Sequence, residues 1–158
     1  MRAQATTEVN GPVVVFTARG LPVGQGSMRT VMAAGRAHIV HNHGKALIDW
    51  RLRIGNEAQV AMGVEPMIVG PVRVVADFYL PRPKAHSAPD GALRPWAPVW
   101  APTTPDIDKL ERALLDALTG VCFADDKQVV SLWCDKYYSD DGVLGVSVNV
   151  AHAHRSME

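Results

Sequence analysis

The chain has 158 residues, 47% of them hydrophobic and 20% charged, a composition that predicts one compact domain around a single hydrophobic core. No apolar run approaches the roughly 20 residues that a membrane helix needs, and the first residues lack the apolar centre of a signal peptide. These observations exclude a membrane protein and predict a cytoplasmic location. Cys122 and Cys134 have no CxxC partner, so we expect them to be packing residues rather than zinc ligands.

The formal net charge of zero is the sum of two opposed halves. Residues 1–104 carry 11 Lys and Arg against 6 Asp and Glu, a balance of +5, whereas residues 105–158 carry 5 against 10, a balance of −5. A basic half beside an acidic cluster suits a metal-dependent enzyme that acts on a polyanion, because basic residues bind phosphates and acids bind the metal. The alternative is ordinary surface charge that happens to segregate.

In the first part of the chain, hydrophobic patterns predict a strand, a hairpin, a helix and a second strand. Residues 13–19 are rich in β-branched side chains and form the first strand. Residues 28–41 form a hairpin whose turn lies at 33–36. Apolar residues recur at helical spacing over 44–62, and strict alternation over 72–80 is typical of a half-buried strand.

The rest of the chain begins with a proline-rich stretch, 81–105, that we expect to be an irregular loop. A second helix is predicted over 107–118, followed by strands over 128–136 and 143–150. This order of elements predicts an α+β fold, with a mixed β-sheet and helices packed on one face of it.

Two pairs of aspartates flank the second predicted helix. Asp106 and Asp108 lie at its start, where we expect the chain to be still extended before the helix is fully formed, so that residues two apart point to the same side and can converge on one ion. The alternative is a pair of acids that only favours the helix dipole. Asp125 and Asp126 follow in an FADDKQ turn, which an antiparallel return from helix to strand could bring back to the first pair. Oxygen ligands alone favour Mg²⁺ or Mn²⁺.

The segment PDIDKLERALLDALTGVCFADDKQVVSL resembles the signature of the RusA family of Holliday junction resolvases. In that signature a DxDN-L-x-K helix start is followed by a DAL segment and a DD-x-QV turn. The resemblance implies one RusA-like domain over residues 1–158. It also implies a homodimeric, Mg²⁺-dependent endonuclease that resolves four-way DNA junctions by paired nicks, with a phage or prophage origin. The family's metal-binding carboxylates fall on Asp106, Asp108 and Asp126, with Asp125 adjacent.

Two cations depart from the family pattern. Lys109 stands where the family usually has Asn, and Arg112 stands where it has a catalytically important Lys. Arginine keeps the positive charge but is a poor proton donor, so we expect Arg112 to stabilise charge in the transition state. Lys109 could supply a displaced version of that charge. The alternative for Arg112 is a surface pair with Asp116 one helical turn away.

Basic residues distributed along the chain are the expected contacts to DNA phosphates. They are Arg29, Arg36, Lys45, Arg82, Lys84 and Lys109. The sequence therefore predicts a Mg²⁺-dependent endodeoxyribonuclease that acts on branched DNA as a homodimer. Two alternatives remain open: a junction-binding protein of the same fold that has lost cleavage, and a structural α+β module whose acids only bind an ion.

Overall fold

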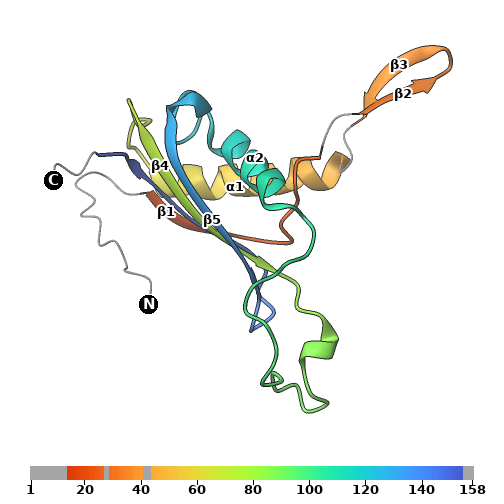
Figure 1. Cartoon of the computed structure of the whole chain (residues 1–158). Helices are drawn as coiled ribbons and strands as arrows, with labels where there is room; N and C mark the ends of the chain where they lie inside the picture. The colour runs from red at the N-terminus through yellow and green to blue at the C-terminus, as the bar shows by residue number, and fades with distance from the viewer. Residues whose placement is uncertain (1–13, 27–28, 41–43, 155–158) are drawn as a thin grey trace.

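The computed structural model describes residues 14–26, 29–40 and 44–154 of the chain. A four-stranded sheet carries both helices on one face, which confirms the predicted α+β fold (Figure 1). The strands of the sheet lie in the order β1, β6, β4, β5, and the separate hairpin of β2 and β3 projects from the body. The elements are β1 (Val14–Arg19), β2 (Arg29–Ala33), β3 (Arg36–Val40), α1 (Gly44–Met62), β4 (Val72–Leu80), η1 (Lys84–His86), α2 (Ile107–Leu118), η2 (Asp126–Gln128), β5 (Val129–Tyr138) and β6 (Gly145–His152).

The predicted elements are all present, with small shifts at the last two strands. Strand β5 continues to Tyr138, which pairs with Leu80 of β4 and whose backbone N–H donates to the Val99 carbonyl of the proline-rich loop at 2.9 Å. In the hairpin turn, Gly35 takes the expected positive φ of 73°, and Ala34 has a φ of 51°. Two successive positive φ values match the twist of the flanking strands, which keeps the hairpin narrow.

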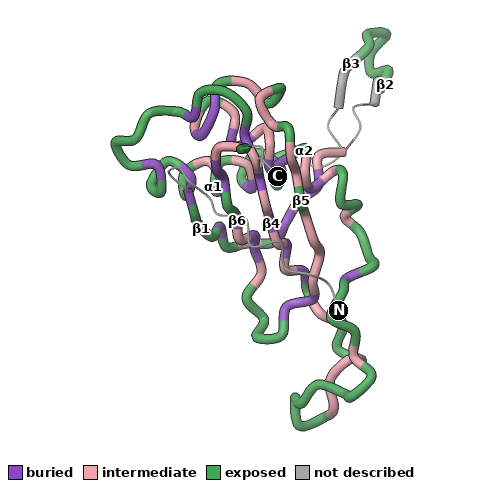
Figure 2. The backbone as a smooth tube through the Cα atoms, turned by 60° about the vertical axis from the view of Figure 1, so that its left-hand side comes forward, coloured by how far each residue is buried: buried purple, intermediate pink, exposed green. Residues whose placement is uncertain are grey.

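The core lies between the inner face of the sheet and the two helices. Alternate residues of β4 are buried on this face, and Trp50 and Ile54 of α1 pack over them with Leu114 of α2. Figure 2 shows the buried residues gathered along the sheet and helices, whereas the hairpin turn (32–37) and the proline-rich loop (81–105) are largely exposed. Each large apolar side chain buried here stabilises the fold by roughly 1.5–3 kcal/mol. Neither helix covers the opposite face of the sheet, which mixes polar side chains such as Asp77 and Asp135 with exposed apolar ones such as Val15 and Trp133.

Strands β4 and β5 are parallel neighbours, and α2 is the crossover between them. Parallel strands need such a connection, and its helix runs antiparallel to both strands. The start of α2 therefore lies at the carboxyl ends of β4 and β5, and its end lies at the amino end of β5. This topology decides where the two aspartate pairs are placed.

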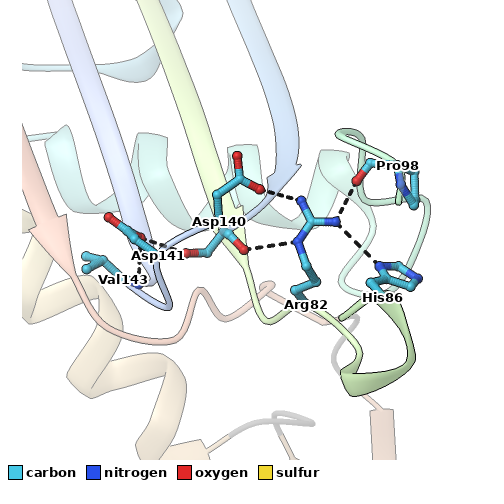
Figure 3. A network of polar contacts seen from close by, with 7 residues as sticks. Arg82, His86, Pro98, Asp140, Asp141 and Val143 are labelled. Carbon is cyan, nitrogen blue, oxygen red and sulfur yellow. Dashed lines mark hydrogen bonds and ion pairs between the residues drawn. The ribbon is translucent and has the colours of Figure 1, made fainter. Parts of the chain in front are cut away.

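The proline-rich loop is anchored at its base by Arg82 (Figure 3). Its guanidinium pairs with Asp140 at 2.5 Å, and it donates to the carbonyls of Ser139 at 3.3 Å and Pro98 at 2.8 Å. It also lies over the Tyr138 ring, with only 9% of the side chain exposed. The prediction that Arg82 contacts DNA phosphate is therefore wrong, because its donors are engaged inside the protein.

Candidate functional site

The start of α2 carries two of the predicted carboxylates and both predicted cations. Asp106 is extended as expected, whereas Asp108 lies in the first helical turn, so the prediction of one extended segment for both is wrong for Asp108. Asp106 occupies the N-cap position in an extended conformation but makes no side-chain cap, and its carboxylate instead pairs with Lys109 at 2.8 Å. The hydrogen bond from Lys109, and then its charge, hold the pKa of Asp106 below its ordinary value. The pKa of Lys109 is raised by Asp106 first, with a smaller contribution from Asp108, and Arg112 opposes this rise. The four groups therefore lie within electrostatic reach of one another.

A glycine-containing strap crosses this end of α2. The backbone N–H of Gln25 donates to the Lys109 carbonyl at 2.9 Å. At Gly24 a Cβ atom would lie 3.0 Å from the Cβ atoms of Lys109 and Pro105, a contact tight enough to favour glycine there. The GQG stretch thus fixes the backbone next to Asp106 and Asp108, a role that its sequence did not reveal.

A hollow of about 430 Å³ lies beside Asp106. Its lining includes Asp135 of β5, a residue that sequence reasoning missed. Asp135 lies directly opposite Asp77 of β4, and burial followed by the charge of Asp135 raises the pKa of Asp77. Both acids lie near the carboxyl ends of their predicted strands, where open parallel sheets bind ligands, but the sequence did not reveal that these two strands are parallel neighbours.

Lys136 also lines the hollow and was missed. Its ammonium donates to the carbonyls of Thr103 at 2.6 Å and Pro105 at 2.8 Å, which fixes the last residues of the loop before α2. Its charge makes a further small contribution to the low pKa of Asp106. Lys136 therefore holds the backbone of the site, with its donors turned to carbonyls.

The second aspartate pair lies at the other end of α2. Asp125 accepts from the backbone N–H of Lys127 at 2.9 Å, and the Gln128 side chain accepts from the backbone N–H of Asp125 at 3.1 Å. This reciprocal arrangement is a capping box at the start of η2, so Asp125 has a structural function. Asp126 is exposed.

The prediction that this turn returns to Asp106 and Asp108 within one chain is wrong. Helix α2 has 12 residues and so spans about 18 Å, and the crossover topology puts the two pairs at its opposite ends. Across residues 14–26, 29–40 and 44–154, no group of three or more His, Cys, Asp or Glu side chains is placed to hold a metal ion.

Arg112 is exposed on α2 and makes no ion pair within the described residues. The alternative prediction, a pair with Asp116, is wrong because Asp116 pairs with Arg51 of α1 at 3.8 Å. The Arg112 guanidinium is therefore left for an external anion, close to Lys109.

The other predicted phosphate contacts lie on separate parts of the molecule. Arg36 is exposed at the turn of the projecting hairpin, and Lys84 is exposed in η1 of the proline-rich loop. Lys45 pairs with Asp49 at 2.5 Å on the surface of α1. The side chain of Arg29 lies outside the described residues. A role for these residues in DNA binding stays a prediction.

The donor set at the start of α2 fits a magnesium ion. Asp106 and Asp108 offer hard carboxylate oxygens that are exposed to solvent. Mg²⁺ keeps several waters and is usually held by one or two protein carboxylates together with phosphates of the substrate. Asp106 beside the hollow and Asp108 in the first turn of α2 could supply these carboxylates.

Comparison with known proteins gives two findings. The family model described as endodeoxyribonuclease RusA matches residues 20–150, a range that includes both aspartate pairs. The uncharacterized protein YqaN of Bacillus subtilis strain 168 is 30% identical over an alignment of 149 residues, which covers 89% of this chain and 98% of that relative. Separately, no helix in the described part of the chain is long and apolar enough to cross a membrane.

Proposed function

The chain belongs to the RusA family of endodeoxyribonucleases, and we propose that it cuts branched DNA, above all four-way junctions, by Mg²⁺-dependent hydrolysis of phosphodiester bonds. One observation carries this proposal. Asp106 and Asp108 lie with Lys109 and Arg112 at the exposed start of α2, so carboxylates that can hold a cation stand beside cations that can hold a phosphate. This combination is what a polyanionic substrate and a divalent metal require.

Asp106 and Asp108 would hold the metal, with water and a DNA phosphate as its other ligands. When bound, Mg²⁺, or Mn²⁺ in its place, supplies activation of water and neutralisation of the charge that develops on the phosphate. Lys109 keeps the Asp106 carboxylate ionised and oriented through their 2.8 Å contact. The strap at Gln25 keeps the first turn of α2 in place under these side chains.

Arg112 would bind the phosphate that is attacked. Its planar guanidinium can donate two parallel hydrogen bonds to nonbridging oxygens and stabilise their growing negative charge. Because a guanidinium does not give up a proton in proteins, the proton for the departing oxygen must come from water. Arg112 thus acts as an electrostatic group in the place where the family has a lysine.

A homodimer is part of this proposal. A four-way junction has near two-fold symmetry, so a two-fold dimer can present one site to each of two opposed strands. Within one chain, the length of α2 separates Asp126 from Asp106 and Asp108. Asp126 can therefore complete a site only if a second copy supplies it, and we include that arrangement in the proposal.

The test uses a synthetic four-way junction with labelled strands, incubated with and without Mg²⁺. We expect wild type to make symmetric nicks only with Mg²⁺, and Asp106→Asn to lose them. The matched control is Asp116→Asn, which removes an acid from the same helix but away from its start, where it contacts Arg51. If Asp106→Asn cuts like wild type, or wild type cuts equally well in EDTA, the proposed site is wrong.

The second candidate function is junction binding without cleavage. The presence of Arg112 in the place of the family's lysine favours it, because arginine cannot act as an acid. Tight binding of the junction in EDTA, with no nicks in either Mg²⁺ or Mn²⁺, would support this alternative.

A further inference from the structure

Three aromatic rings form a stack at the edge of the sheet beside the proposed metal site. Tyr79 of β4 lies 5.8 Å from Tyr137 of β5, with their planes 26° apart. Trp100 of the proline-rich loop stacks on Tyr137 at 4.8 Å and 23°. The Trp100 side chain is still 54% exposed, so the stack ends in an indole that can accept another ring.

Trp100 lines the same hollow of about 430 Å³ as Asp106 and Asp135. An aromatic surface is therefore next to a carboxylate that we propose as a metal ligand. A nucleic acid is the ligand that has both a planar ring for the indole and, one sugar away, a phosphate for the metal. Stacking of a base on an aromatic side chain strengthens binding and tolerates any sequence.

The indole is held in a fixed position before any ligand binds. Backbone bonds join its two neighbours to β5: Ala101 donates to the Lys136 carbonyl at 3.1 Å, and Tyr138 donates to the Val99 carbonyl at 2.9 Å. A rigid platform loses little conformational entropy on binding.

Asp135 adds a hydrogen-bond acceptor to the hollow. Its Oδ2 atom accepts from the indole N–H of Trp133 at 3.1 Å and from the hydroxyl of Tyr137 at 3.3 Å. These bonds fix the carboxylate and leave its Oδ1 atom without a hydrogen bond among the described residues. Adenine, cytosine and guanine carry an exocyclic amine that could donate to such an oxygen, whereas thymine does not.

We propose that Trp100 and Asp135 form a nucleobase subsite, in which one base released from the duplex at a branch point stacks on the indole and donates its amine to Asp135. The inference rests on the proposed function, because the phosphate next to that base is the one brought to Asp106. A base can leave the helix at little cost where pairing is already interrupted. The subsite would thus direct cleavage to branch points rather than to continuous duplex.

The experiment combines Trp100→Ala with an abasic scan of the junction. Junctions with a single abasic nucleotide, moved one position at a time across the branch point, are measured with wild type and variant. The dissociation constant in EDTA and the single-turnover nicking rate in Mg²⁺ are both recorded. We expect Trp100→Ala to weaken binding or slow nicking of the intact junction about 5- to 100-fold, the range for the loss of one stacked base.

At one abasic position, the affinity and nicking rate of wild type should fall to those of Trp100→Ala on the intact junction. The same abasic nucleotide should not lower the affinity or nicking rate of the variant any further. Such non-additivity identifies the base that contacts Trp100. Thymine at that position should bind more weakly than cytosine. The matched control is Trp96→Ala: Trp96 is 62% exposed in the same loop but packs edge-on against His86 and does not line the hollow, so its loss should change neither readout.

The outcomes separate the subsite from the proposed cleavage. If the dissociation constants show this non-additivity but no nicks form, the result supports the subsite and overturns the proposed cleavage. Nicking by wild type with purely additive effects at every position, or a Trp100→Ala variant equal to wild type, overturns the subsite and leaves the cleavage standing. Failure to bind junctions at all overturns both.

Discussion

The two ends of the parallel pair of β4 and β5 use the same residue types in opposite ways. At the amino end, polar side chains form hydrogen bonds with the backbone: Asp125 caps η2, and Gln128 donates to the carbonyls of Ile68 at 2.9 Å and Gly70 at 3.0 Å. At the carboxyl end, Asp106 makes no such cap and stays exposed beside a hollow, and Asp108 is exposed in the first turn of α2. A polar group that stabilises the fold is satisfied by the chain itself, whereas one that binds a ligand is left partly unsatisfied.

This comparison assigns different roles to the two neighbouring aspartates Asp125 and Asp126. Asp125 and Gln128 form a capping box, and this structural function explains why an aspartate and a glutamine occur at these two positions. Asp126 has no such structural reason among the described residues, and it alone of the turn remains a candidate ligand. The comparison predicts that the two neighbouring aspartates respond to substitution in opposite ways.

The largest expected effect is restoration of cleavage by mixing two inactive variants. If the site combines the start of α2 from one protomer with Asp126 from the other, a mixed dimer of Asp106→Asn and Asp126→Asn contains one fully intact site. Refolding the two variants together in equal amounts should then restore about a quarter of wild-type nicking, since half of the dimers are mixed and each has one working site. The nicking assay on a four-way junction measures it.

The control mixture is Asp106→Asn with Asp108→Asn, whose substitutions lie at the same end of α2. Every dimer formed from that pair has a damaged aspartate pair in both sites, so no activity should return. Absence of restoration in the first mixture as well would contradict a site shared between protomers.

The next effect concerns the anchor of the proline-rich loop, which belongs to the carboxyl end of the sheet. Arg82→Met should lower the free energy of unfolding by about 3 kcal/mol, because it removes a buried cation and leaves Asp140 and two carbonyls without their donor. Urea denaturation measures the loss. Lys84→Met, two residues further and exposed, should change stability by less than about 0.5 kcal/mol. Equal effects would mean that Arg82 is not the anchor.

Most of the fold could be predicted from the sequence, because its elements have clear periods and clear stops. Helix α1 was predicted over its full length from apolar spacing alone, and the alternation of β4 gave both its bounds and its buried face. The strand order and the parallel pairing could not be predicted, since periodicity describes one element at a time. The strand order and pairing determine which aspartates can share a site, because only this topology shows that Asp126 and Asp106 lie at opposite ends of α2.

The grouping of the candidate residues could be predicted where they are close in sequence, but not where they are distant. Asp106, Asp108, Lys109 and Arg112 fall within two helical turns, so local spacing was enough to group them. Asp135 reaches the site only through the registry of β5 with β4, which no local pattern encodes. Arg82 was misjudged because an arginine that binds phosphate and one that anchors a loop are identical in sequence.

A smaller effect separates the two neighbours of the DD turn. Asp125→Ala should reduce the free energy of unfolding by about 1 kcal/mol through loss of the cap, with nicking unchanged at a temperature well below unfolding. Asp126→Asn should leave stability unchanged and reduce nicking. Thermal unfolding and the junction assay, run on both variants, measure the contrast. The reverse pattern would place the ligand at Asp125 and remove the division of roles at the amino end.

The smallest effect tests the charge repulsion near the carboxyl ends of β4 and β5, where Asp77 lies opposite Asp135. Burial and the charge of Asp135 raise the pKa of Asp77, and its carboxylate makes no hydrogen bond among the described residues. An acid whose pKa is raised on folding destabilises the folded state when ionised, so Asp77→Asn should be more stable than wild type at pH 7. The gain should be below about 1 kcal/mol, because solvent screens a partly exposed pair.

This gain must depend on pH with a definite sign. It should hold above the raised pKa of Asp77, shrink as pH falls through that pKa, and vanish below the ordinary value of 3.8, where Asp77 is protonated in both folded and unfolded states. Urea denaturation between pH 3.5 and pH 7.5 on about ten buffers measures it, with Glu57→Gln on the exposed side of α1 as the control. A gain that grows toward low pH would show that Asp77 is stabilised as a carboxylate, which would place a cation rather than repulsion at the carboxyl end of the sheet.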